Sequence, residues 1–316
     1  MTKRPFSCPN RTVLLLSLVA ILSGCVKSPS RPPNVLLIVI DTLRRDHLSC
    51  YGYARQTSPF IDTLAAESVR FDRAYATAPW TSPSVASMIT GRYPSSHGLN
   101  RVGPLLPTRV TLAEILRDQG YATAGFASNF LIGKRFNFDQ GYDEFRETEA
   151  RSPRELHEAI TSGTVTQWGQ EALRRFADLK RPFFLFAHYF DPHYNYKRHP
   201  ESGYADARAG RLDGTQTIIE LREMSGTMTE EEIAFMKDLY DEEIRHTDAA
   251  IGRLLGTLRE LDLYNNTLIV LTADHGEEFM THGWIGHTRT LYEELVRVPL
   301  IIREPGGRRS SSETWR

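Results

Sequence analysis

The chain contains little cysteine, no excess of charge of either sign and no apolar run long enough to cross a bilayer. Three cysteines occur among its 316 residues, and the formal net charge is −1. This balance lacks the positive field that draws proteins to nucleic acid, so no nucleic-acid partner is expected. The sequence shows no internal repeat. What remains, 41% hydrophobic and 24% charged residues, is typical of a globular domain.

The amino-terminal residues differ in kind from the rest. A basic start precedes the apolar run 13–22, and residues 22–25 read Leu-Ser-Gly-Cys. This pattern predicts an export signal over residues 1–25, and its run is too short for a permanent spanning helix. The ending resembles the lipobox of bacterial lipoproteins, in which Cys25 would carry the lipid; a simple cleaved signal is the alternative. We expect an exported protein, lipid-anchored to a bacterial membrane and facing the periplasm or the outside.

The predicted signal sets the remaining boundaries. Residues 26–33 are rich in Ser and Pro and predict a short tether, residues 34–307 form the folded domain, and residues 308–316 form a polar tail. Beyond Cys25 only Cys50 remains, so no intramolecular disulfide is expected even in an oxidising compartment.

Short apolar runs rich in β-branched or aromatic residues predict strands that are buried on both faces. They cover residues 35–40, 183–187 and 267–271. Helical patterns over 59–69, 112–119 and 230–261 lie between them, and a further strand is expected over 296–303. The alternation predicts an α/β fold, an α/β/α sandwich with a mainly parallel central sheet. On the helix 230–261, the acidic Asp241, Glu242, Glu243 and Asp248 are expected to face solvent.

Polar, metal-capable residues follow each of the three buried runs. Ligands bind at the carboxyl ends of parallel strands, so the sequence predicts a site at one edge of the sheet. The residues concerned are Asp41 after the first run, His188, Asp191 and His193 after the second, and Asp274 and His275 after the third.

Residues 78–91 carry a helix start signal, with hydroxyl residues before a proline expected at the first helical position. Thr81 or Ser82 is therefore placed at a helix N-terminus, where free N–H groups stabilise an anion. A hydroxyl there can act as a nucleophile toward a sulfate or phosphate group. Taken alone, the pattern is weak, because Ser or Thr at such a position is usually only a helix cap.

Three ordered motifs resemble the signatures of the sulfatase family, in the alkaline phosphatase-like superfamily. They are Asp41–Leu48, the turn Thr81–Ser84 with Thr90–Pro94 and His97–Gly98, and Asp274–Glu277. The resemblance runs from Pro33 to about Gly307 and implies a sulfatase-like catalytic domain. It also implies a smaller C-terminal subdomain after the strand 296–303, which is expected to be missing here.

The chain departs from the sulfatase pattern at the nucleophile. In that family the residue matching Thr81 is a cysteine or serine that is converted to formylglycine, and an arginine stands where this chain has Val85. Thr81 cannot be converted in this way. It resembles instead the threonine that attacks phosphorus directly in nucleotide pyrophosphatases and bacterial phosphoethanolamine transferases.

The resemblance implies one divalent cation held by Asp41, Thr81, Asp274 and His275. Typical sulfatases have asparagine in place of His275 and bind calcium, whereas an imidazole favours zinc or manganese. The expected ion is therefore Zn, Mn or Ca, and a second ion is an open alternative.

Four histidines form a second candidate group: His188, His193, His282 and His287. His193 and His287 are the candidates for the general acid or for ligands of a second ion, and Asp191 is expected to orient His193. His188 and His282 are equally well explained as structural histidines. Arg44, Asp46 and His97 are interpreted as residues that fix helix starts and loops.

These residues predict a metal-dependent hydrolase of sulfate esters or phosphoric mono- or diesters, with Thr81, His193 and His287 as catalytic residues. The expected substrate is a sulfated or phosphorylated small molecule, glycan or lipid. Two alternatives remain open at this point: a phosphoethanolamine-type transferase, and an inactive lipoprotein that binds anions.

Overall fold

The computed structural model of the protein describes residues 32–148 and 161–307. The predicted signal 1–25, most of the tether 26–33 and the tail 308–316 lie outside the described residues. No helix within the described ranges has an apolar stretch of the length that crossing a membrane requires.

The described residues form an α/β fold with one large sheet. Its strands are β1 (Asn34–Ile40), β2 (Val69–Tyr75), β3 (Ala122–Ala127), β4 (Glu144–Glu147), β5 (Phe183–Tyr189), β6 (Thr267–Ala273) and β9 (Arg297–Arg303), and β7 (Glu278–Phe279) pairs with β8 (Ile285–Gly286) in a separate ribbon. The α-helices are α2 (Pro59–Ala66), α3 (Thr81–Thr90), α4 (Pro94–His97), α5 (Leu112–Asp118), α7 (Ser162–Ala177), α8 (Ile218–Met224), α9 (Glu230–Glu260) and α10 (Glu293–Val296). Short 3₁₀ turns are η1 (Arg45–His47), η2 (Ser49–Tyr51), η3 (Phe130–Ile132), η4 (Lys134–Phe136), η5 (Ser225–Thr227) and η6 (Tyr264–Asn266).

The strand order of the large sheet is β2-β9-β6-β1-β5-β3-β4. β1 pairs in parallel with β5 and β6, and β3 pairs in parallel with β4 and β5. Only the edge formed by β9 and β2 is antiparallel. The prediction of a mainly parallel sheet is confirmed, and the three predicted central strands are the neighbours β5, β1 and β6.

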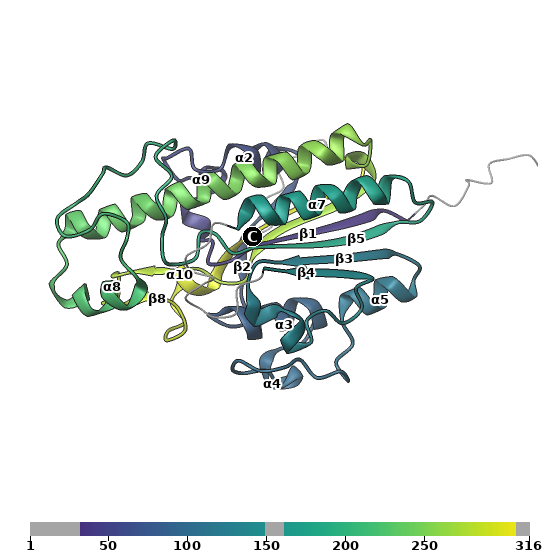
Figure 1. Ribbon diagram of the computed structural model, residues 1–316, viewed down its shortest axis with the longest axis horizontal. Helices are drawn as coiled ribbons and strands as arrows, with labels where there is room; N and C mark the ends of the chain where they lie inside the picture. Colours follow the sequence, from purple (N-terminus) through teal and green to yellow (C-terminus); the bar gives the residue numbers. More distant parts are fainter. Residues whose placement is uncertain (1–31, 149–160, 308–316) are drawn as a thin grey trace, which may run out of the picture. The chain divides into compact units, whose positions relative to one another are not determined.

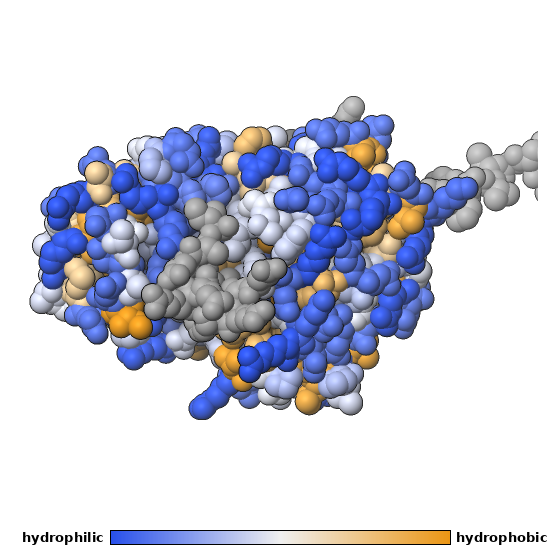
Figure 2. Space-filling model, viewed as in Figure 1, coloured by the Kyte–Doolittle hydropathy of each residue, from blue (hydrophilic) through white to orange (hydrophobic). Residues whose placement is uncertain are grey.

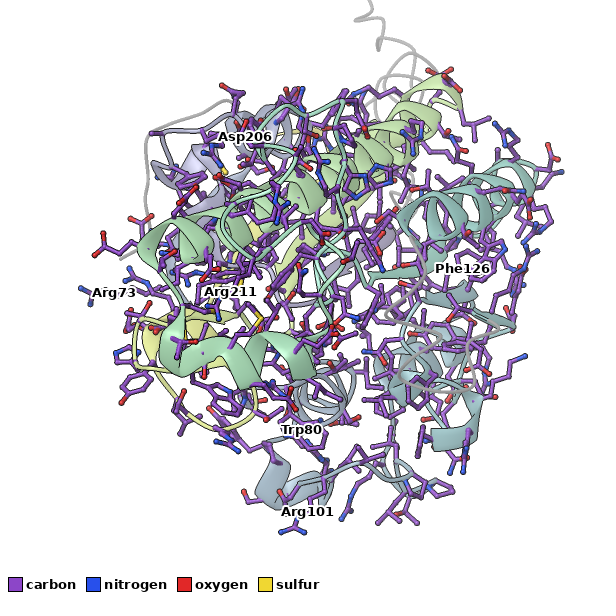
Figure 3. The ribbon with its side chains drawn as sticks, turned by 60° about the vertical axis from the view of Figure 1, so that its left-hand side comes forward. Arg73, Trp80, Arg101, Phe126, Asp206 and Arg211 are labelled. Atoms are coloured by element: carbon purple, nitrogen blue, oxygen red, sulfur yellow. The ribbon has the colours of Figure 1, made fainter. Side chains whose placement is uncertain are left out.

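Helices cover both faces of the sheet, so the predicted sandwich is also confirmed. In Figure 1, α7 and α9 lie above the sheet, and α3, α4 and α5 lie below it. Phe126 of β3, labelled in Figure 3, packs against Trp168 of α7 with ring centroids 6.1 Å apart. The strand β5 is buried along its whole length, as expected when both faces of a parallel sheet are covered. On the face drawn in Figure 2, hydrophobic residues are scattered among hydrophilic ones.

Some predicted boundaries were wrong. The helix predicted over 59–69 ends at Ala66, and the strand β2 begins at Val69. The sequence Val-Arg-Phe-Asp-Arg-Ala-Tyr has the alternation of an antiparallel strand, and it pairs with β9. Helix α7 occupies a stretch that the sequence analysis did not assign. Its first residues are Ser, Gly, Thr and Val, which are poor helix formers, and packing against β5 stabilises it.

The acidic residues of α9 do not face solvent, contrary to the prediction. Asp241, Glu242 and Asp248 are fully buried, and Glu243 is 2% exposed. Their carboxylates accept hydrogen bonds from main-chain N–H groups and side chains of neighbouring segments; Asp248, for example, accepts from the first N–H groups of α2. A buried carboxylate is stable only with such partners, and a single helix sequence does not show which segments supply them.

Candidate active site at the carboxyl edge of the sheet

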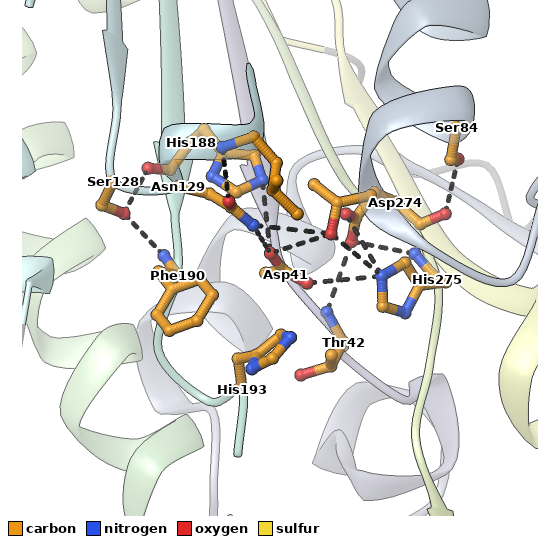
Figure 4. A network of polar contacts seen from close by, with 12 residues as sticks. Asp41, Thr42, Ser84, Ser128, Asn129, His188, Phe190, His193, Asp274 and His275 are labelled. Carbon is orange, nitrogen blue, oxygen red and sulfur yellow. Dashed lines mark hydrogen bonds and ion pairs between the residues drawn. The ribbon is translucent and has the colours of Figure 1, made fainter. Parts of the chain in front are cut away.

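The segments that follow β1, β5 and β6 meet at one edge of the sheet, as predicted. Asp41 follows β1, and Asp274 and His275 follow β6; the side chains of these three residues are fully buried. Within the described ranges, they form a group whose potential ligand atoms lie within 4.8 Å of one another. Figure 4 shows this group with the side chains around it.

The backbone fixes the two carboxylates against each other. Thr42 has a left-handed conformation, with φ of 56°, which turns the chain sharply after β1. Its N–H donates to Asp274 Oδ1 at 3.3 Å, and the N–H of His275 donates to the same oxygen at 2.9 Å. Ser84 of α3 donates to the carbonyl oxygen of Asp274 at 2.6 Å, which ties the helix to the end of β6.

Thr81 is the first residue of α3, and its side chain points into this group. Its Oγ1 lies 3.4 Å from Asp41 Oδ2 and 3.4 Å from His275 Nε2. The predicted proline lies at the third helical position, not the first, because the helix begins at Thr81 after the cap residue Trp80. Thr81 therefore stands in the first turn of a ten-residue helix, at the end of the helix dipole that favours an anion.

The arrangement fits a divalent cation. Asp41 Oδ1 and Asp274 Oδ2 are buried and have no hydrogen-bond partner in the described chain. His275 Nε2 lies 3.4 Å from the first and 3.5 Å from the second, while its Nδ1 contacts the carbonyl oxygen of Gly276 at 2.9 Å. Burial, and then the charge of Asp274, raise the pKa of Asp41 well above its usual range. Two buried carboxylates beside an imidazole are stable together when a cation neutralises them.

Asn129 belongs to the same group, and the sequence analysis missed it. Its Nδ2 donates to Asp41 Oδ2 at 3.0 Å and lies 3.5 Å from Thr81 Oγ1. Its Oδ1 accepts from the N–H of Leu131 at 3.0 Å. Asn129 follows β3 almost directly, so the rule that found Asp41 and Asp274 applies to it as well. The signal was missed because β3, with the sequence Ala-Thr-Ala-Gly-Phe-Ala, is less apolar than its neighbours.

Of the two histidines predicted as catalytic, His287 lies beside His275 and His193 lies beside His287. The rings of His275 and His287 have centroids 4.4 Å apart, and those of His287 and His193 are 4.9 Å apart. Glu277, a buried residue for which the sequence predicted no role, lies with Oε1 2.9 Å from His287 Nδ1. Burial raises the pKa of Glu277 to about 8, although the neighbouring His275 opposes the shift.

The partners of Asp191 differ from those that were predicted. Its carboxylate accepts from the N–H groups of Thr161 and Ser162 at the start of α7, at 3.0 and 2.8 Å. The Nδ1 of His193 lies 2.8 Å from the carbonyl oxygen of Tyr194. The prediction that Asp191 orients His193 is therefore replaced by a role in capping α7.

The two remaining histidines lie in different places. His188 is fully buried, with Nε2 3.8 Å from Asp41 Oδ2, and burial lowers its pKa to about 4. His282 lies instead against Glu294, with Nδ1 2.7 Å from the carboxylate, and stacks on Tyr292. His188 thus borders the site as a neutral imidazole, whereas His282 belongs to a separate surface group.

The residues interpreted as fixing loops make the contacts of that role. Arg44 donates to both oxygens of Asp46 and to the carbonyl oxygen of Glu277 at 3.1 Å. His97 Nδ1 accepts from the N–H of Leu99 at 3.1 Å, so that its Nε2 can donate to Ser87 on α3.

Comparison with known proteins places this geometry in a family. The family model described as Sulfatase matches residues 33–315. The chain belongs to the sulfatase family. Steryl-sulfatase of Rattus norvegicus is 29% identical over 387 aligned residues, which cover 94% of this chain and 66% of the relative. The chain thus spans about two thirds of that relative's length.

Solved structures share the sulfatase fold seen here. Phosphonate monoester hydrolase of Agrobacterium radiobacter superposes with a TM-score of 0.68 at 23% identity, covering 87% of this chain and 68% of that one. The C-terminal periplasmic domain of EcEptC from Escherichia coli, solved in complex with Zn, superposes with a TM-score of 0.66 at 20% identity, covering 87% of this chain and 74% of that one. The fold prediction is confirmed by these likenesses.

Proposed function

We propose that this sulfatase-family chain hydrolyses sulfate or phosphate esters with Thr81 as the nucleophile. One observation carries the proposal: the Thr81 hydroxyl lies at the start of α3, 3.4 Å from both Asp41 and His275. A threonine that served only as a helix cap would not need two buried carboxylates and an imidazole around its side chain. A sulfated substrate is supported by the similarity to a steryl-sulfatase. A substrate that contains phosphorus is supported by the phosphonate monoester hydrolase that shares the fold.

We assign Asp41, Thr81, Asp274 and His275 as the ligands of one divalent cation. When bound, such an ion lowers the pKa of the nucleophile hydroxyl and screens the negative ester oxygens. The mixture of carboxylate oxygens and one imidazole nitrogen favours zinc or manganese over calcium. The Zn complex of the fold neighbour EcEptC agrees with this preference.

The chain's own residues supply the remaining steps. The Thr81 hydroxyl loses its proton to solvent, its oxygen forms a bond to sulfur or phosphorus, and the bond from that atom to the ester oxygen breaks. His193 or His287 donates a proton to the departing oxygen, which leaves as an alcohol. Water then attacks the sulfur or phosphorus and gives a proton to the histidine that protonated the alcohol. The bond to Thr81 breaks, and sulfate, phosphate or, from a diester, a phosphate monoester is released. The N–H groups at the start of α3 stabilise the anionic group throughout.

We also propose that the protein is exported and anchored through a lipid on Cys25, with residues 26–33 as a tether. The anchor would place the site near sulfated or phosphorylated lipids and glycans. Radiolabelled palmitate added to expressing cells should enter the wild-type protein and not a Cys25→Ala variant. Equal labelling of both would reject the anchor without touching the catalytic proposal.

The catalytic proposal is tested by comparing esters of the two kinds. The purified protein is assayed with p-nitrophenyl sulfate, p-nitrophenyl phosphate and bis-p-nitrophenyl phosphate, and metal content is measured on the same sample. Thr81→Ala should abolish turnover, whereas Thr81→Ser should keep part of it because a hydroxyl remains. Mass spectrometry of acid-quenched protein should find the sulfuryl or phosphoryl group on Thr81. Turnover by Thr81→Ala close to that of the wild type would reject the nucleophile, and a metal-loaded wild type without any turnover would favour an anion-binding protein.

A further inference from the structure

A second group of metal-capable side chains lies between a loop and helix α9. His199 and Glu201 belong to the segment that links β5 to α8, and His246 belongs to α9. Their potential ligand atoms lie within 4.8 Å of one another. None of these residues belongs to the site at the carboxyl edge of the sheet, and no motif discussed above includes them.

One carboxylate oxygen of Glu201 lies within reach of both imidazoles. Glu201 Oε1 lies 3.6 Å from His199 Nδ1 and 3.9 Å from His246 Nδ1. In a tetrahedral zinc site with bonds of about 2.0–2.1 Å, two ligand atoms are roughly 3.3 Å apart. The two observed separations exceed this value by about 0.3 and 0.6 Å. The rings of His199 and His246 are stacked, with centroids 4.2 Å apart, so one of them must also turn for both nitrogens to bind the same ion.

Glu243 prepares His199 for this role. Its Oε1 accepts from the N–H of Lys197 at 2.6 Å, and its Oε2 lies 3.1 Å from His199 Nε2. A carboxylate so placed accepts the Nε2 proton of a neutral His199, which leaves the lone pair on Nδ1. Metal-binding histidines characteristically donate their other ring N–H to a carboxylate in this way.

The exposure of the three side chains also suits an ion that arrives from solvent. The side chain of His199 is 3% exposed, that of His246 is 27% exposed and that of Glu201 is 69% exposed. The first ligand is thus held rigidly, and the other two leave an entry path and an open position for water. Two imidazoles and one carboxylate are a donor set that zinc prefers.

We propose that His199, Glu201 and His246 form a second divalent-cation site, of zinc type, which fastens the segment after β5 to helix α9. This segment begins with Asp191 and His193, so the ion would stabilise the part of the chain that carries a proposed general acid. The same segment is already tied to α9, since the N–H of His199 donates to Glu242 at 2.7 Å. Farther along, Arg211, labelled in Figure 3, pairs with Glu232 of α9. The ion would add a metal bridge between these ties.

The alternative occupant of this position is a proton. A protonated His199 could bridge Glu243 and Glu201 as an ordinary ion pair, and no metal would be needed. The two cases differ in metal stoichiometry, which is independent of enzymatic activity. They also differ in their response to Glu201→Gln, which changes an exposed side chain without altering its size.

The experiment counts metal ions in the intact protein. Wild type, Glu201→Gln, His246→Gln and the matched surface control Glu223→Gln are loaded with Zn²⁺, dialysed and analysed by inductively coupled plasma mass spectrometry. Asp274→Asn is included to remove the ion at the proposed catalytic site. We expect two ions per chain in wild type and Glu223→Gln, and one in each of the other three variants. Competition with a chromophoric chelator should show that Glu201→Gln and His246→Gln bind Zn²⁺ at the second site more than 10- to 100-fold more weakly than the wild type. That factor is typical of the loss of a residue that only supports a ligand, and these two variants lose a ligand itself.

Circular dichroism checks that each variant is folded. Equal zinc content in wild type, Glu201→Gln and His246→Gln would overturn the second site. So would an Asp274→Asn protein that holds no zinc after loading. Failure of the catalytic proposal gives a different result. If the wild type bound no ion at Asp274, Glu201→Gln would still contain one zinc ion fewer than the wild type.

Discussion

Replacing Asn129 by serine separates the contact of this side chain with Asp41 from its contact with Leu131. The donor to Asp41 Oδ2, at 3.0 Å, is lost, because a serine hydroxyl is too short to reach it. A hydrogen bond to an ionised group contributes roughly 1.5–3 kcal/mol, so kcat/KM should fall roughly 10- to 150-fold if Asp41 works as an ionised ligand. The hydroxyl can still accept from the N–H of Leu131, which caps η3, so stability should change little.

Asn129→Ala removes both contacts and serves as the comparison. It should lose the same factor in kcat/KM and, in addition, about 1 kcal/mol of unfolding free energy from the missing cap. Steady-state kinetics on the preferred nitrophenyl ester and urea unfolding give the two numbers, with the exposed Asn100→Ser as control. A kcat/KM for Asn129→Ser within threefold of the wild type would show that this residue does not position Asp41 or Thr81.

Three further outcomes follow from the structure. Arg211 and the N–H of Thr229 hold the carboxylate of Glu232, and the Arg211 bonds are the main reason that its pKa is lowered to about 2. The wild type should therefore be more stable than Glu232→Gln above pH 4.5, and this difference should shrink as the pH falls toward 2. Urea unfolding should show a decrease of roughly 1–2 kcal/mol after allowance for solvent screening. The same difference in unfolding free energy at pH 3 and pH 6 would contradict this. A Cβ on Gly276 would clash with the carbonyl oxygen of Glu294. Gly276→Ala should therefore lower the unfolding free energy by about 1–3 kcal/mol. An unchanged melting temperature would show that the loop can move to make room for the methyl group. Removal of bound cations with EDTA should abolish ester hydrolysis and lower the melting temperature. The loss of unfolding free energy should be about 2.7 kcal/mol if the free ion was present at 100 times its Kd. Added zinc should restore activity and stability, and full activity after verified metal removal would reject metal dependence.

The sequence predicted the centre of this fold well and its periphery poorly. The strands β1, β5 and β6 were found because apolar residues fill them without interruption, which is the pattern of strands buried on both faces. The strand β2 was missed because it lies at the antiparallel edge and alternates instead. Helix α7 was missed because its stability comes from packing on the sheet, which a local pattern does not record.

The candidate site divides in the same way. Asp41, Asp274 and His275 could be predicted because each follows a strand that the sequence makes obvious. Asn129 follows a strand in the same way, but it was missed because β3 is less apolar than its neighbours. Glu277 could not be predicted, since its role depends on which atoms meet across the site. The buried state of Glu243 was beyond prediction for a related reason: its partners come from a loop that lies more than forty positions away along the chain.

The carboxylates of α9 accept most of their hydrogen bonds in the β5–α8 segment from main-chain N–H groups, such as those of Lys197, His199, Tyr204 and Ala205. Every amino acid except proline offers this donor. The segment can therefore change nearly all of its side chains and keep its path over α9. A protein built in this way can acquire a new substrate preference through the outward-facing positions of that segment while the backbone that carries His193 stays where it is.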